Sequence, residues 1–99
     1  MKGWCNFMRN IEFLWDKNSI TYDENNEEYN RLFIYHVFEC FNDLIEVRGY
    51  LYLNAIYEMF GVAWDTDREN LYFRERIRFK VDKIQDGFLI NVFGLEESA

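Results

Sequence analysis

The spacing of apolar residues changes near residue 70, and this change restricts the chain to folds that combine helices with a sheet. Before residue 70, apolar residues recur at helical intervals; after it, they alternate with bases up to a turn signal at Asp86-Gly87, and a second apolar run follows. We therefore predict an α+β fold. A long central helix and short helices pack on a small antiparallel sheet that ends in a C-terminal β-hairpin.

Local signals set the expected ends of two helices. Asn26 can cap a long helix over residues 27–47, which has acids in its first turn and Gly49 beyond its end. The broad apolar stripe of this helix predicts that much of it is buried. Asn54 is the expected cap of a second helix, Ala55 to Phe60, which the following glycine ends.

Shorter segments complete the predicted order. Residues 4–15 have i, i+3, i+4, i+7 apolar spacing and predict a first amphipathic helix. Leu51–Leu53 predicts a third strand, because a lone hairpin is only marginally stable. The polar stretches in the first half of residues 18–30 and in residues 64–70 predict loops, and the tail from Leu95 to Ala99 is expected to fray.

Composition narrows the function classes. The 99 residues form one expected domain, and 20% aromatic content excludes a disordered chain. A formal charge of −7 argues against direct binding of nucleic acid, which needs a basic surface. Charges interrupt every apolar run before the roughly 18 residues of a membrane span, and no secretory signal is recognised. With only two cysteines, we expect a reduced, cytoplasmic setting.

The acids are concentrated in residues 12–46, which hold nine acids and two bases and so carry the whole net charge. One interpretation is a solvated helix face and loop. The other is a negative surface that steers the protein onto a basic partner. The candidate partner-binding residues are Tyr22, Asp23, Glu24, Glu27, Glu28 and Tyr29.

His36 and Cys40 are four residues apart on the long helix, a spacing that could place two ligands on one metal ion. Zinc needs four ligands, or three and a water, so we interpret both as packing residues of the helix core and expect no metal and no cofactor. His36 is the only histidine in the sequence, so a Ser–His–Asp arrangement has little support, and no glycine-rich phosphate loop occurs. We therefore expect a protein that is not an enzyme.

Between Phe73 and Val81, bases alternate with apolar residues. Successive side chains of a strand point to opposite faces of a sheet, so these bases are expected on one face of one strand. We interpret them as a solvated face that pairs with carboxylates and blocks edge pairing, in preference to a phosphate site. These bases are Arg74, Arg76, Arg78 and Lys80.

Two segments carry a resemblance to known proteins. They are Gly49-Tyr50-Leu51-Tyr52-Leu53-Asn54-Ala55-Ile56-Tyr57-Glu58-Met59-Phe60-Gly61-Val62 and Ile84-Gln85-Asp86-Gly87-Phe88-Leu89-Ile90. They lie within the stretch from Phe41 to Phe93, about half the chain, which in outline is similar to small phage and mobile-element proteins of unknown function. In its acidic, aromatic-rich character the chain also resembles anti-defence inhibitors, including anti-CRISPR proteins.

This resemblance implies a stoichiometric inhibitor in the cytoplasm of a bacterial host cell. Its partner would be a protein with a basic, nucleic-acid-binding surface, such as a CRISPR effector. Carboxylates would stand in for phosphates, and Tyr22 and Tyr29 would anchor the contact. The alternative is a homo-oligomeric structural or assembly protein, such as a homodimer, because 20 aromatic residues can leave apolar surface uncovered.

Overall fold

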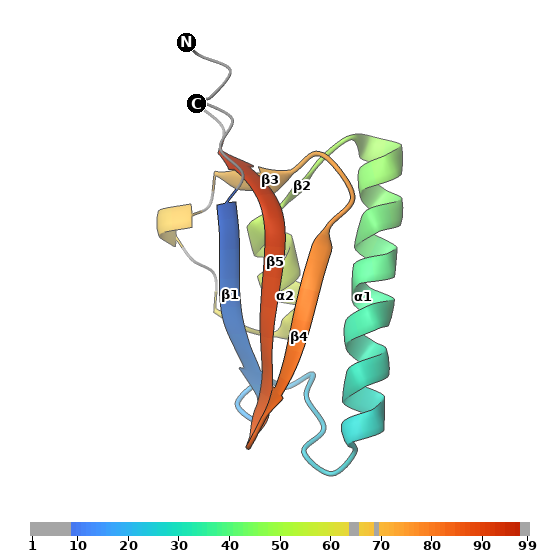
Figure 1. The fold of residues 1–99 in the computed structure, drawn as a ribbon, viewed down its shortest axis with the longest axis vertical. Coiled ribbons are helices and arrows are strands. Elements are labelled where there is room, and N and C mark those ends of the chain that lie inside the picture. The colour runs from blue at the N-terminus through green and yellow to red at the C-terminus, as the bar shows by residue number, and fades with distance from the viewer. Residues whose placement is uncertain (1–8, 64–65, 69, 98–99) are drawn as a thin grey trace.

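Helices and strands are segregated, with both helices packed on one face of an antiparallel sheet (Figure 1). The computed structural model describes residues 9–63, 66–68 and 70–97. These residues form two α-helices, a short 3-10 helix at Thr66–Arg68 and a five-stranded sheet. The α+β class predicted from the sequence is therefore confirmed.

One strand, β5 (Gly87–Glu97), joins the sheet together. β1 (Arg9–Asp16) pairs with one of its edges. β4 (Arg78–Ile84) pairs with the first part of the other edge, and β3 (Leu71–Phe73) pairs with the last part. β2 (Leu51–Tyr52) pairs in turn with β3, and all of these pairings are antiparallel.

A β-bulge at Gly94 marks the place where β5 changes partner. Arg9 lies opposite Leu95, whereas Asn10 lies opposite Phe93, so Gly94 is an extra residue on its strand. Its φ of +91° is in the left-handed region that favours glycine. The strand pairs with β4 before this bulge and with β3 after it.

The last strand extends further than the sequence predicts. Leu95 is fully buried and Glu96 is only 6% exposed, because β3 pairs with this end of β5. The expected frayed tail is thus wrong for residues 95–97, and residues 98–99 lie outside the described ranges.

The core forms where the sheet meets both helices, around Phe60 at the end of α2 (Leu53–Phe60). The Phe60 ring lies 5.2 Å from that of Trp15 on β1 and 5.7 Å from that of Phe38 on α1 (Glu27–Arg48), measured between centroids. The sheet contributes Ile11, Phe13, Trp15, Leu51, Leu71, Phe73, Phe88, Ile90, Val92 and Leu95 to this core.

The helix α1 has the predicted caps but not the predicted surroundings. The Asn26 side chain accepts a hydrogen bond from the Tyr29 backbone N–H, and Gly49 ends the helix with φ +89°. The helix lies along one side of the sheet, and its outer face is open: Leu32 is 65% exposed and Val47 is 84% exposed (Figure 1). Its apolar core side consists of Ile34, Val37, Phe38, Phe41 and Ile45.

The first helix predicted from the sequence is instead β1 over residues 9–16. Ile11, Phe13 and Trp15 alternate toward the core, while Leu14, which helical spacing would bury, is 45% exposed. Pairing with β5 satisfies the backbone of this segment and selects the two-residue period. The earlier part of that predicted helix lies outside the described residues.

The second helix begins two residues before its predicted start. Leu53, expected to end the third strand, is already the first helical residue, and Tyr52 occupies the cap position without a side-chain hydrogen bond. Asn54 is therefore not the cap, and its side chain is buried within the first turn. Gly61 ends the helix with φ +72°, as predicted.

The predicted basic strand is divided between β3 and β4. Residues 74–77 leave the sheet, because Ile77 is buried and its N–H donates to Oδ1 of Asn42 on α1. Only two of the four bases thus lie on a common strand, which corrects the expected single basic face; they are Arg78 and Lys80.

The hairpin between β4 and β5 is present, but its turn lies one residue earlier than predicted. The turn residues are Gln85-Asp86, and Gly87 is the first residue of β5, paired with Ile84. Gly87 has no positive φ. This position requires glycine for lack of space and not for its backbone angle, because a Cβ there would lie 2.6 Å from the Trp15 carbonyl oxygen.

Candidate protein-binding surface

The six predicted partner-binding residues lie in the loop after β1 and in the first turn of α1, at one end of the molecule (Figure 1). There they meet the β4–β5 turn around a polar hollow of about 190 Å³. The hollow is lined by Lys17, Tyr22, Glu24, Glu27, Asn30, Lys83, Gln85 and Asp86. The structure thus joins three of the predicted residues to groups that the sequence analysis missed.

The loop is held in place from both sides. Asn30, which is 1% exposed, accepts a hydrogen bond from the Asp23 N–H at 3.0 Å and donates one to the Asp23 carbonyl at 2.7 Å. The hydroxyls of Ser19 and Thr21 both donate to the Phe60 carbonyl at the end of α2. These bonds tie the acidic loop to both helices, so its backbone is organised before any partner arrives.

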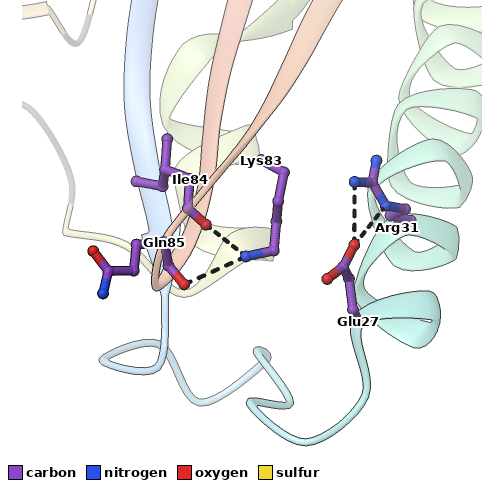
Figure 2. A network of polar contacts seen from close by, with 5 residues as sticks. All are labelled: Glu27, Arg31, Lys83, Ile84 and Gln85. Carbon is purple, nitrogen blue, oxygen red and sulfur yellow. Dashed lines mark hydrogen bonds and ion pairs between the residues drawn. The ribbon is translucent and has the colours of Figure 1, made fainter.

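The carboxylate of Asp23 has a local role as well, since its Oδ1 accepts the N–H of Asn25 at 2.9 Å. Glu24 and Glu28 are exposed. Glu27 forms an i, i+4 ion pair with Arg31, whose Nε and Nη2 both lie 3.2 Å from Oε2 (Figure 2). The four predicted carboxylates are therefore not equivalent, and two of them already have partners within the chain.

The two expected aromatic anchors differ in position. Tyr29 is 44% exposed and available to a partner. Tyr22 is half-buried, with its ring edge-on to Trp15 at 5.0 Å and 6.3 Å from Phe88. Tyr22 thus belongs mainly to the core, and only Tyr29 has the exposure that the sequence analysis assumed for both.

Burial and nearby carboxylates act together on Tyr22. Burial raises the pKa of Tyr22 above its usual 10.0, and negative charges from three segments raise it further. These charges are Glu27, Asp16, Asp86 and Glu24, in order of decreasing effect. The hydroxyl therefore stays protonated, and remains a hydrogen-bond donor, to a higher pH than an ordinary tyrosine.

Cations also lie at this end. The guanidinium of Arg31 is 5.3 Å from the centre of the Phe88 ring and the ammonium of Lys83 is 5.6 Å from it. Lys83 also donates to the carbonyls of Ile84 and Gln85 (Figure 2). With Asp16, Lys17 and Asp86 included, the end holds six acids and three bases, a mixed surface with a negative excess.

An apolar groove of about 530 Å³ continues from Tyr29 along the outer face of α1. Its lining residues are Tyr29, Leu32, Phe33, Tyr35, His36 and Glu39. The sequence analysis missed this groove because it assigned the apolar residues of the helix to the core. Leu32 and His36 lie opposite the stripe that Ile34 and Phe38 form, a difference visible in the helical spacing alone.

His36 and Cys40 are exposed on this outer face, so their predicted role as core packing residues is wrong. Ile34, Phe38 and Phe41 define the side that is buried, and the i, i+4 pair faces away from it. The Cys40 sulfur lies 3.9 Å from Nε2 of His36. Within the described ranges, no three His, Cys, Asp or Glu side chains of one chain gather closely enough to hold a metal ion.

Two of the predicted basic residues have carboxylate partners. Arg74 Nε lies 3.2 Å from Oε2 of Glu96, whose side chain is 8% exposed. Lys80 Nζ lies 3.9 Å from Oδ2 of Asp82. The buried acid near the end of β5 accounts for the position of Arg74, as expected of paired bases and not of a phosphate site.

Comparison with known proteins gives no further assignment: no family model matches the chain, and neither a curated protein nor a solved structure shows significant similarity to it. Of the helices in the described part of the chain, none is both long and apolar enough to cross a lipid bilayer.

Proposed function

We propose that this protein is a small acidic interaction protein without enzymatic activity, of the phage or mobile-element type. It acts as a stoichiometric inhibitor by docking its acidic end on a basic, nucleic-acid-binding surface of a bacterial protein such as a CRISPR effector. The observation that supports this function best is geometric: Glu24, Glu27 and Asp86, from three segments, line one hollow beside the held loop. A solvated surface does not require such a fixed backbone.

In this function the carboxylates occupy positions that phosphates take on the partner. The bonds from Asn30 and from the hydroxyls of Ser19 and Thr21 fix the loop beforehand, which lowers the entropy cost of association. Complementary charge accelerates the encounter and aligns the two proteins. Tyr29 and the adjacent groove supply apolar contact beside the charged region.

The lysines and Arg31 at the same end add selectivity. A uniformly negative surface would bind many basic proteins, whereas Lys17, Lys83 and the Glu27–Arg31 pair oppose basic groups at defined positions. Such opposed charges raise the free energy of wrong complexes. A partner must therefore match both signs.

The test is affinity capture from a bacterial lysate at low and high salt, followed by competition. The bait is wild type or the quadruple variant Asp23→Lys, Glu24→Lys, Glu27→Lys, Glu28→Lys. The control reverses four exposed acids elsewhere, Asp43→Lys, Glu46→Lys, Glu58→Lys, Glu75→Lys, and so has the same net charge. We expect capture by wild type and control, loss in the quadruple variant, and release by the nucleic acid that the captured protein binds.

Equal capture by the quadruple variant would contradict this function, as would a partner that nucleic acid does not displace. Because Asp23 and Glu27 have partners within the chain, thermal unfolding of each bait must be measured. Exposed ion pairs contribute only about 0–1 kcal/mol, so all baits should remain folded.

Self-assembly is the second candidate function, and one observation favours it. The outer face of α1 leaves large apolar side chains in solvent, including Leu32 at 65% and Val47 at 84% exposure. Light scattering separates the two functions, because an oligomer closed by apolar contact persists at high salt whereas the acidic docking contact weakens.

A further inference from the structure

His36 and Cys40 are neighbours on the outer face of α1. Both side chains are exposed, on successive turns, and the Cys40 sulfur lies 3.9 Å from Nε2 of His36. An imidazole nitrogen and a thiolate are ligands that Zn²⁺ prefers. Neither group has a core role that would explain its position.

One chain supplies too few ligands. A structural zinc site is tetrahedral and needs four, and the described residues of a single chain contain no third ligand in place. Two copies related by a twofold axis would provide two histidines and two cysteines. The site is therefore incomplete in a monomer and complete in a symmetric pair.

The outer face of α1 is self-complementary when two copies of the helix run antiparallel, level with each other at residue 38. His36 of one copy then lies beside Cys40 of the other. A twofold axis repeats each contact in reverse, as a closed dimer requires.

Exposed apolar residues near the two helix ends meet in the same alignment. Tyr29 of one copy is level with Val47 of the other, and both lie on the side of the helix that carries His36 and Cys40, because about five whole turns separate them. Their side chains are 44% and 84% exposed. Apolar residues and metal ligands thus coincide in a single register.

We propose that this face binds a second copy of the chain, and that one Zn²⁺ closes the dimer through His36 and Cys40 of both copies. Each histidine binds as neutral imidazole, and each thiol releases its proton to solvent on forming the zinc–sulfur bond. Two thiolates balance the charge of the ion, and no electron is transferred. The proposal shares Tyr29 and the apolar groove with the surface of the inhibitor function, but it rests on the metal ligands and not on that function.

The first experiment measures mass against zinc. The full chain is stripped with chelator, held in a reductant that does not bind zinc, and titrated with Zn²⁺ during light scattering. We expect a monomer mass to double at one zinc per two chains and to return on adding chelator. Binding of one zinc per chain without a change in mass would overturn the proposal, as would a dimer that persists after chelator is added.

The second experiment identifies the ligands. Cys40→Ala and His36→Ala should each abolish the zinc-dependent dimer and, with Co²⁺ in place of Zn²⁺, the tetrahedral thiolate absorption. Both positions are exposed, so the metal-free variants should unfold at the same temperature as the metal-free wild type. Cys5→Ser and Met59→Ala are the matched controls and should dimerise normally. Loss of the dimer in Cys5→Ser would assign the site to the wrong thiol.

The third experiment tests the register. Val47→Glu puts a charge against the Tyr29 ring of the other copy and should weaken dimerisation, and so should Tyr29→Lys, which puts a charge against Val47. The double variant places opposite charges side by side and should recover affinity for the second copy. No recovery would exclude the antiparallel alignment, even if zinc still links two chains.

Discussion

The backbone N–H of Ile77 donates a hydrogen bond to Oδ1 of Asn42, at 2.6 Å and across 35 residues of sequence. Both residues are buried, at 4% and 5% exposure. The bond fixes the connection between β3 and β4 to the middle of α1. Without it, this connection would leave an N–H in the core without an acceptor.

Asn42→Ala should consequently destabilise the protein by about 1–3 kcal/mol, because it removes the acceptor and leaves a buried donor unsatisfied. Asn91→Ala is the comparison, since its side chain bonds only to the exposed carboxylate of Glu12, and it should cost clearly less. Urea unfolding of both variants provides the measurement. Equal losses would show that the Asn42 bond has no special weight.

Gly87→Ala should cost about 1–3 kcal/mol through overpacking, since the new Cβ would meet the Trp15 carbonyl oxygen at 2.6 Å and the Asp16 Cβ at 2.7 Å. Gly49→Ala tests the other reason for glycine. It has open space around it but a φ of +89°, so it should lose only about 1 kcal/mol. Thermal unfolding compares the two, and the reverse order would contradict the close contact at Gly87.

Tyr22 should make stability depend on pH in the alkaline range. Its pKa is raised in the folded protein by burial and by nearby carboxylates, so the unfolded chain releases this proton first. Its contribution to the free energy of unfolding is complete below about pH 10 and is lost as the pH rises through the pKa of the folded protein. Tyr22→Phe should remove that part of the alkaline loss in urea unfolding. Unchanged alkaline sensitivity would count against the raised pKa.

Asn30→Ala tests whether loop order matters for binding, because it removes both bonds to Asp23 without changing net charge. We expect weaker capture of the partner, with a faster dissociation rate and an unaltered salt dependence. Asn25→Ala alters the same loop but retains both Asn30 bonds, and it should bind like wild type. If the two variants bind equally well, a prearranged loop is not needed.

Where the sequence predicted structure well, a local signal decided the outcome. The Asn26 side chain caps α1 and Gly49 ends it, and both interactions involve residues within one or two turns. Residues 9–15 had no such signal. Ile11, Phe13, Leu14 and Trp15 satisfy a helical and an alternating pattern together, and pairing with β5, far along the chain, selects the strand.

The candidate binding surfaces also combine residues that the sequence could indicate with residues that only tertiary contacts bring there. Clustering of acids along the chain marked the loop before α1, but the contributions of Lys83 and Asp86 depend on a tertiary contact. His36 was misplaced because α1 has apolar residues on both sides. Periodicity alone does not say which side the sheet will cover when Leu32 and Phe38 are equally apolar.

The position of β5 has a consequence for how the chain is made. β1, β3 and β4 all precede the strand that pairs with each of them, so during synthesis they leave the ribosome with no partner for those edges. α1 and α2 can form from local contacts in that interval, whereas Arg9 must wait for Leu95. Nascent chains that end before Gly87 therefore expose the apolar side of β1. We expect chaperones to bind the chain chiefly at this stage of synthesis.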